Sequence, residues 1–268
     1  MIPFGLKLEF TGARCCLWSC KLVCLRGLEF ERRRAWRISG NLLGVRDFAL
    51  GDKYFLKPEI RQKSKSFAKV KMTKLRIISG EFGGRLISST DNILTHPMGD
   101  RVRSALFAKI FSRKNLDGAR VLDLFAGTGA IGLEALSRGA GNATFVEKNS
   151  SAAKIIRENI KLLGLENRAK VLQNSLEKFA ENLANLSDEE KFDFVLLDPP
   201  YGISENLAEI AKLEANVEKV VKYACAKNAL VVLSYRSGEA LPNLRGVVVV
   251  DNPKSYGEAS LIFYKTEN

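Results

Sequence analysis

The sequence predicts an α/β protein built on a doubly wound sheet, and two motifs in an alternating strand and helix pattern support this prediction. The apolar run Val121 to Phe125 is followed by the small-residue turn Ala126 to Gly129, and helical apolar spacing begins at Ala130. Further strands and helices alternate until a second motif, Asp198 to Tyr201, ends another apolar run. Because parallel strands end at one edge of such a sheet, both motifs are expected at one site.

Length and composition indicate a globular protein with a basic N-terminal part. The chain has 268 residues, 46% of them hydrophobic, and a formal net charge of +12. Most of the basic excess lies in residues 1–71, a smaller part lies in residues 72–120, and residues 121–268 are slightly acidic. We therefore expect a polyanionic partner to bind mainly outside the catalytic part of the chain. No apolar run approaches the length of a membrane span, and we expect a cytoplasmic protein.

Residues 1–71 show no clean period and are predicted to be an atypical basic extension, disordered or translated from a misplaced start before Met72. An organelle transit peptide and a basic RNA-binding arm are the alternatives. The cysteines at the beginning lack the paired spacing of a zinc knuckle, so no metal is expected. These residues are Cys15, Cys16, Cys20 and Cys24.

Residues 72–120 are predicted to hold a small hairpin and a helix. The strands are Leu75 to Ile78 and Leu86 to Ser88, and the helix runs from about Asp100 to Arg113 with Asp100 as its N-cap. His96, the only histidine, precedes a proline in a loop and is not expected to be a general base. The candidates for RNA phosphate contacts are Arg76, Arg85, Arg101 and Arg103.

The glycine loop predicts a nucleoside-like cofactor. Gly127 and Gly129 permit conformations closed to other residues, and Gly132 completes Gly-x-Gly-x-x-Gly with Glu147 twenty residues after Gly127. This pattern alone fits a dinucleotide. Asp123, however, would repel a pyrophosphate and attract the cationic S-adenosylmethionine (SAM). We therefore expect SAM contacts from Asp123, Phe125, Ala126, Gly127, Thr128 and Gly129.

The next two strands supply further cofactor candidates. Ala143 to Glu147 ends on an acid that can accept hydrogen bonds from both ribose hydroxyls. The amphipathic helix Ser150 to Leu163 and the strand Lys170 to Gln173 follow. Asn174 and Ser175 are placed to meet the adenine edge, although such a pair also commonly caps a helix.

The Asp198-Pro199-Pro200-Tyr201 motif follows the strand Phe192 to Leu197 and predicts the catalytic residues. Two prolines remove amide donors, which leaves carbonyl oxygens and the Asp198 carboxylate as hydrogen-bond acceptors. Such acceptors suit an amino group, and Tyr201 offers a face on which a planar base can stack. Methyl transfer to that amine depends mainly on positioning.

The rest of the chain is predicted to complete the sheet. A long helix is expected from about Glu205 to Ala226, with Cys225 as a small core residue inside it. The strands predicted after it are Leu230 to Ser234, Val247 to Val250 and Ser260 to Tyr264.

Residues 74–265 resemble the RsmD-type methyltransferases, which modify the exocyclic N2 of a guanine in 16S ribosomal RNA. The glycine loop and Asp-Pro-Pro-Tyr occur across many SAM enzymes, whereas the N-terminal segments point to RsmD in particular. The matching segments are Arg76 to Gly80 with Gly84-Arg85, Asp100 to Arg103 with Leu106-Phe107, Asp123 to Gly129, and Asp198 to Tyr201.

The resemblance implies a Rossmann-like class I SAM-dependent methyltransferase with a seven-stranded doubly wound sheet and a small N-terminal β/α extension. It also implies a guanine flipped beside Asp198 and Tyr201, in small-subunit rRNA or an assembled subunit. Residues 72–120 would then face RNA and residues 121–268 would form the methyltransferase domain. The chain departs from the family at Asn174 and Ser175, where an Asp is common. We expect a monomer.

Other functions fit parts of the pattern. Asp-Pro-Pro-Tyr also resembles adenine-N6 enzymes acting on nucleic acid, and a related motif occurs in enzymes that methylate a protein glutamine. An NAD-binding oxidoreductase would use the same glycine pattern. A non-catalytic RNA-binding protein on this scaffold is a further alternative.

Overall fold

The computed structural model describes residues 9–10, 13–14, 72–90, 98–183, 186–202 and 206–267. The chain divides into two compact units, residues 1–67 and residues 68–268. In the first unit, β1 (Glu9–Phe10) pairs antiparallel with β2 (Ala13–Arg14). The rest of the predicted basic extension, its four cysteines and the loop that contains His96 lie outside the described residues.

The second unit is built on a sheet in which seven strands follow the order β10-β12-β9-β8-β5-β6-β7. The five strands from β9 to β7 in this order are parallel, and β12 runs antiparallel to β9. β11 is a short additional strand that pairs with β12 beside β10. The strands are β5 (Arg120–Leu124), β6 (Asn142–Val146), β7 (Ala169–Leu172), β8 (Phe192–Leu197), β9 (Cys225–Arg236), β10 (Val247–Val249), β11 (Lys254–Tyr256) and β12 (Ala259–Thr266).

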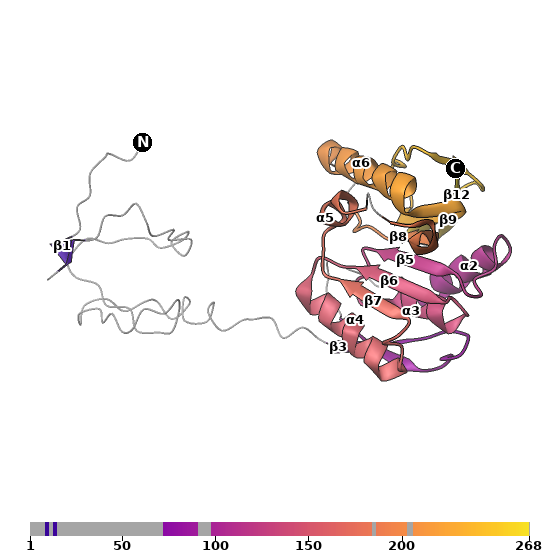
Figure 1. Cartoon of the computed structure of the whole chain (residues 1–268), viewed down its shortest axis with the longest axis horizontal. Coiled ribbons are helices and arrows are strands. Elements are labelled where there is room, and N and C mark those ends of the chain that lie inside the picture. The colour runs from indigo at the N-terminus through magenta and orange to yellow at the C-terminus, as the bar shows by residue number, and fades with distance from the viewer. Residues whose placement is uncertain are drawn as a thin grey trace. The chain divides into compact units, whose positions relative to one another are not determined.

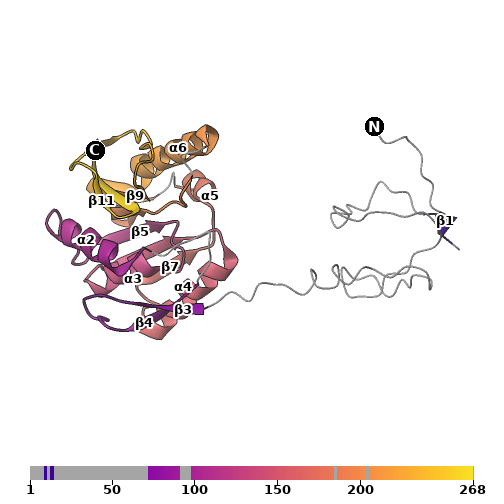
Figure 2. The same ribbon diagram turned by 180° about the vertical axis from the view of Figure 1, so that it is seen from behind.

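Helices cover both faces of this sheet, which confirms the doubly wound class (Figures 1 and 2). Side chains alternate along β5, so Val121 enters the core beneath one helical layer and Leu122 and Leu124 enter the other. One layer contains α2 (Asp100–Phe111), α3 (Ala130–Ser137) and α4 (Ser150–Leu163); the other contains α5 (Leu176–Glu181) and α6 (Leu207–Ala224). A short 3-10 helix, η2 (Asp188–Glu190), precedes β8. None of the described helices combines the length and apolar character needed to cross a membrane.

The predicted hairpin is present near the start of this unit. β3 (Met72–Arg76) pairs antiparallel with β4 (Leu86–Thr90), close to the expected strands. Ile77 and Ile87 are buried in the core that α3 and α4 share, and β4 packs against α4. The hairpin is therefore attached to the helices that follow β5 and β6, rather than to the sheet itself.

Two local predictions are wrong. Asp100 is the first residue of α2 and not its N-cap, a position that Gly99 takes, and the Asp100 carboxylate accepts a hydrogen bond from Arg103. Cys225 is not in a helix: α6 ends at Ala224, and Cys225 begins β9 beside Phe192 of β8. The apolar helical pattern continues into an equally apolar strand, so periodicity alone could not mark the change.

Candidate active site

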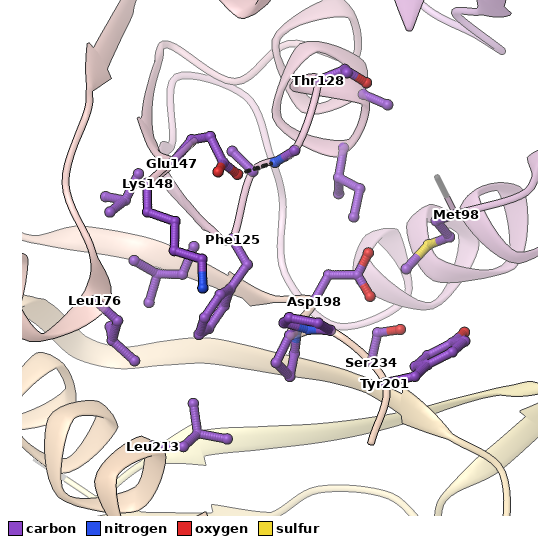
Figure 3. A pocket seen from close by; sticks show the side chains of 18 of the residues that line it. Met98, Phe125, Thr128, Glu147, Lys148, Leu176, Asp198, Tyr201, Leu213 and Ser234 are labelled. Atoms are coloured by element: carbon purple, nitrogen blue, oxygen red, sulfur yellow. Dashed lines mark hydrogen bonds between the residues drawn. The ribbon is translucent and has the colours of Figure 1, made fainter. Parts of the chain in front are cut away.

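The ends of four neighbouring parallel strands line one cavity of about 610 Å³, a volume suited to a nucleoside-sized cofactor and part of a substrate (Figure 3). The loops after β5, β6, β7 and β8 all contribute, as the strand order predicts. The predicted residues that line it are Phe125, Ala126, Gly127, Thr128, Glu147, Asn174, Ser175, Asp198, Pro199, Pro200 and Tyr201.

The glycine loop is held in place by Glu147. Gly127 and Gly129 both have left-handed backbones, with φ of 55° and 82°, which turn the chain from β5 into α3. The Glu147 carboxylate accepts hydrogen bonds from the amides of Gly127, at 2.8 Å, and Asn149, at 2.6 Å. Figure 3 shows the bond to Gly127. Glu147 therefore shapes the loop and also borders the cavity, where its remaining acceptor capacity is available to ribose hydroxyls.

Phe125 has a left-handed backbone, with φ of 61°, which is uncommon for a bulky residue. Its side chain packs against the core on the α5 and α6 side and also lines the cavity. Backbone strain of this kind costs on the order of 1–3 kcal/mol and persists where the surroundings hold it. Here the packing of Phe125 fixes the point at which β5 turns into the glycine loop.

Asp123 lies beneath the loop instead of on the cavity wall. It is almost completely buried, and its Oδ2 accepts a hydrogen bond from the Gly132 amide at 2.9 Å. Gly132 is in the first turn of α3, whose N-cap Gly129 has no side chain, so Asp123 satisfies an amide that the helix leaves free. Burial raises the pKa of Asp123 to about 8, and the charges of Asp198 and Glu147 add to the effect.

A cationic cofactor fits the acidic residue on the cavity wall. The second carboxylate oxygen of Asp123 is buried without a hydrogen-bond partner among the described residues. Glu147 borders the cavity at this strand edge, where a carboxylate favours a sulfonium or ammonium group over a pyrophosphate.

Asp198 sits at the end of β8, where Figure 3 shows its carboxylate directed into the cavity between Phe125 and Met98. Burial raises the pKa of Asp198 to about 6, while the Ser234 hydroxyl beside it acts in the opposite direction. The carboxyl group is therefore largely ionised at neutral pH and can accept hydrogen bonds from an amino group.

The residues after Asp198 form a rigid, partly open rim. Pro199 is buried, and Tyr201 is 41% exposed beside the cavity, as stacking on a base requires. Gly202 follows with a φ of 85°, and its amide donates a hydrogen bond to Glu239. Desolvation raises the pKa of Tyr201, and the charges of Asp198, Glu258 and Glu239 raise it further, so its hydroxyl stays protonated.

Asn174 and Ser175 both lie in the short segment between β7 and α5. Ser175 caps α5 by accepting a hydrogen bond from the Lys178 amide, so the helix-cap interpretation holds for it although it also lines the cavity. Asn174 lines the cavity too. Its contact with adenine stays a prediction.

Several cavity residues were missed by sequence reasoning. Ser234 ends a predicted strand at the same sheet edge and Lys148 follows Glu147, so the strand-end argument could have included both. Met98 and Glu258 come from loops whose position only the fold reveals. Other residues not predicted to line the cavity include Gly99, Val102, Leu176, Glu209, Lys212 and Leu213.

The predicted arginine cluster divides in two. Arg76, Arg85 and Arg101 are exposed, although Arg76 donates a hydrogen bond to the Gly84 carbonyl and Arg85 lies over the Phe82 ring. The prediction for Arg103 is wrong, because this side chain is 1% exposed. Its guanidinium donates to the carbonyl oxygens of Met98 and Arg76 and to Asp100, so it joins segments of the protein to one another.

The fold and site define a class I SAM-dependent methyltransferase fold, with the glycine loop after the first parallel strand of the chain and Asp-Pro-Pro-Tyr after the fourth. The family described as "Conserved hypothetical protein 95" matches residues 75–265, and the chain belongs to this family. The resemblance to RsmD-type proteins is confirmed by the names of its relatives. In the described part of the chain, no group of three or more His, Cys, Asp or Glu is arranged to hold a metal.

Two relatives and one solved structure illustrate the similarity. "Putative rRNA methyltransferase YlbH" of Bacillus subtilis is 32% identical over 71% of this chain and 98% of its own length. "Ribosomal RNA small subunit methyltransferase D" of Haemophilus influenzae is 35% identical over 52% of this chain and 68% of its own. The structure titled "Putative methyltransferase yhhF from Escherichia coli" superposes with a TM-score of 0.59 and 27% identity, covering 73% of this chain and 99% of that one.

Proposed function

We propose that this protein is an rRNA methyltransferase that moves a methyl group from SAM to the exocyclic N2 of a guanine in small-subunit ribosomal RNA. The observation that carries the proposal is the shared cavity, in which the Asp198 carboxylate faces the space bounded by the glycine loop. Relatives named as small-subunit rRNA methyltransferases support the substrate class.

The cofactor is SAM, which supplies a methyl group on a positively charged sulfur. The loop from Phe125 to Thr128 and Glu147 border the half of the cavity that would hold its nucleoside. Glu147 accepts the ribose hydroxyls, and the acidic strand edge attracts the cation. Asp123 supports this arrangement from below through Gly132.

The chain orients the target amine. A guanine amine is a weak nucleophile because its lone pair is delocalised into the ring. Asp198 and the carbonyl oxygens beside the prolines accept the hydrogens of this amine and aim its lone pair at the methyl carbon. As the new carbon–nitrogen bond forms and the carbon–sulfur bond breaks, the surplus proton leaves through Asp198 or water. Tyr201 holds the flipped base by stacking.

Residues 72–120 form the RNA-facing segment in this proposal, and residues 121–268 form the methyltransferase domain. Exposed Arg76 and Arg85 on the hairpin and Arg101 on α2 are the phosphate contacts. Such contacts position the RNA, whereas the choice of base depends on the cavity.

The proposal is tested by offering labelled SAM with four parallel substrates: small ribosomal subunits that lack the modification, naked rRNA, DNA and ribosomal protein. We expect label in the rRNA. Label in DNA or in protein glutamine would keep the cofactor and overturn the substrate. No transfer, together with binding of NAD in place of SAM, would indicate an oxidoreductase instead.

A further inference from the structure

The hairpin and the cofactor loop are joined by one buried side chain, Asn159 on α4. Asn159 is 1% exposed, and its amide group makes three hydrogen bonds. Its Oδ1 accepts from the Ser88 amide at 2.8 Å, and its Nδ2 donates to the Ser88 carbonyl at 2.9 Å and to the Thr128 carbonyl at 3.1 Å. Ser88 belongs to the hairpin and Thr128 to the glycine loop, so one amide group connects the two segments.

The Asn159 side chain makes the two backbone hydrogen bonds with Ser88 that a neighbouring strand would otherwise make. Ser88 pairs with Lys74 inside the hairpin, and its own amide and carbonyl point away from that ladder. These two groups would otherwise need another partner, because an unpaired backbone group costs free energy when buried. Asn159 bonds to both groups and also donates a hydrogen bond to the carbonyl of Thr128, which lines the cavity. The next hairpin residue adds a second contact, since the hydroxyls of Ser89 and Thr128 lie 3.2 Å apart.

Buried polar contacts also fix the opposite end of the hairpin. Glu134 on α3 is fully buried and accepts hydrogen bonds from the amides of Ile78, at 2.7 Å, and Ser79, at 3.1 Å. α3 begins directly after the glycine loop, so both ends of the hairpin are bonded to segments that adjoin this loop. Arg103 provides a separate link from the hairpin carbonyl of Arg76 to the carbonyl of Met98 on the cavity wall.

We infer that Asn159 is a positioning residue that couples the hairpin to the cofactor loop, so that RNA on the hairpin and the cofactor in the cavity strengthen one another's binding. The inference rests on the proposed function, because it takes the hairpin to be an RNA contact. Coupling between two sites is reciprocal, so either ligand reports on it. It follows that the cofactor alone must change the hairpin, which can be measured without RNA.

The first experiment is hydrogen exchange by mass spectrometry on the full chain, with and without saturating S-adenosylhomocysteine. In the wild type, we expect slower exchange both in the glycine loop and in the hairpin peptide that contains Ser88, by about fivefold or more. In Asn159→Ala the slowing should persist in the loop and disappear from the Ser88 peptide. Protection confined to the loop in the wild type, or unchanged hairpin protection in Asn159→Ala, would overturn the inference.

Two further variants separate coupling from damage to the fold. Asn216 is another buried helical asparagine, on α6, whose amide donates to the Lys212 carbonyl; Asn216→Ala should behave like the wild type. Ser89→Ala removes only the hydroxyl contact with Thr128 and should give partial loss of hairpin protection, even if Asn159→Ala fails to fold. Full protection in Ser89→Ala together with an unfolded Asn159→Ala would contradict the coupling.

The second experiment measures S-adenosylhomocysteine affinity with and without small ribosomal subunits. We expect the subunits to tighten binding by about fivefold or more in the wild type and to have little effect in Asn159→Ala. Methyl transfer by the wild type without any such tightening would overturn the coupling alone. Failure of the wild type to bind S-adenosylhomocysteine would instead overturn the proposed function.

Discussion

Asp123 and Asp198 lie at the ends of adjacent strands, yet their surroundings suit them to different tasks. Desolvation raises both pKa values, to about 8 for the buried Asp123 and about 6 for Asp198. Asp123 is sealed beneath the glycine loop and bonded to Gly132, so it supports backbone structure. Asp198 faces the cavity and is ionised at neutral pH, so it can receive an amine.

The pKa of Asp198 predicts how the rate depends on pH. The carboxylate form accepts the amine hydrogens, so the single-turnover rate should rise with pH up to about 6 and then level off. Below that value the rate should fall about tenfold per pH unit, because protonation turns the acceptor into a donor. SAM affinity, measured over the same range, serves as the control. A flat rate between pH 5 and 7 would contradict this role of Asp198.

The pKa of Asp123 predicts a pH dependence of stability. The folded carboxyl keeps its proton up to about pH 8, whereas the unfolded one releases it near the ordinary aspartate pKa of 3.8. Folding therefore takes up a proton in this window, and the free energy of unfolding should fall as pH rises, by up to about 1.4 kcal/mol per pH unit. Asp123→Asn should flatten this slope in urea unfolding series. An unchanged slope would show that Asp123 ionises normally.

At the level of elements, the glycines of the loop after β5 and of the first turn of α3 have two different roles. A Cβ on Gly132 would lie 2.4 Å from the Phe145 ring and 2.9 Å from Asp123, so this glycine allows close packing. A Cβ on Gly127 would meet nothing within 4 Å, because Gly127 borders the cavity. One glycine therefore serves the fold and the other leaves room for a ligand.

Alanine substitutions should separate these roles. Gly132→Ala should lower the free energy of unfolding by roughly 1–3 kcal/mol through overpacking. Gly127→Ala should cost about 1–2 kcal/mol for its left-handed backbone and, in addition, weaken SAM binding. Gly118→Ala is the matched control, since Gly118 has a similar φ of 69° and open space but lies outside the cavity. Equal SAM affinity in the Gly127 and Gly118 variants would show that the loop does not contact the cofactor.

At the scale of the whole molecule, the sequence predicted the features that depend on which residues lie at the carboxyl ends of the parallel strands. The apolar runs, the glycine loop and Asp-Pro-Pro-Tyr were sufficient to predict the doubly wound sheet and the common edge of the site. Tertiary roles were not visible in the same way. Arg103 has the sequence context of a phosphate contact, and only the packing of the hairpin against α2 shows that it is buried. Asn159 carries no sequence signal beyond a helical position, although it links two segments that are distant in sequence.

The division of the chain is open to a direct test. We predict that a chain beginning at Met72 retains the unfolding midpoint and methyl-transfer rate of the full chain, since residues 68–268 form their own compact unit. Thermal unfolding and transfer to small subunits, compared side by side, check this expectation. Loss of folding or of RNA affinity would mean that residues 1–71 belong to the functional protein.

The central claim is that Asp198 presents a guanine amine to the methyl group, and nucleoside analysis of the methylated rRNA tests it most directly. With the wild type, the label should appear as N2-methylguanosine. With Asp198→Ala, this product should fall about a hundredfold or more while SAM affinity stays unchanged, because Asp198 faces the target amine and not the cofactor. Label in N6-methyladenosine, or full activity of Asp198→Ala, would contradict the account.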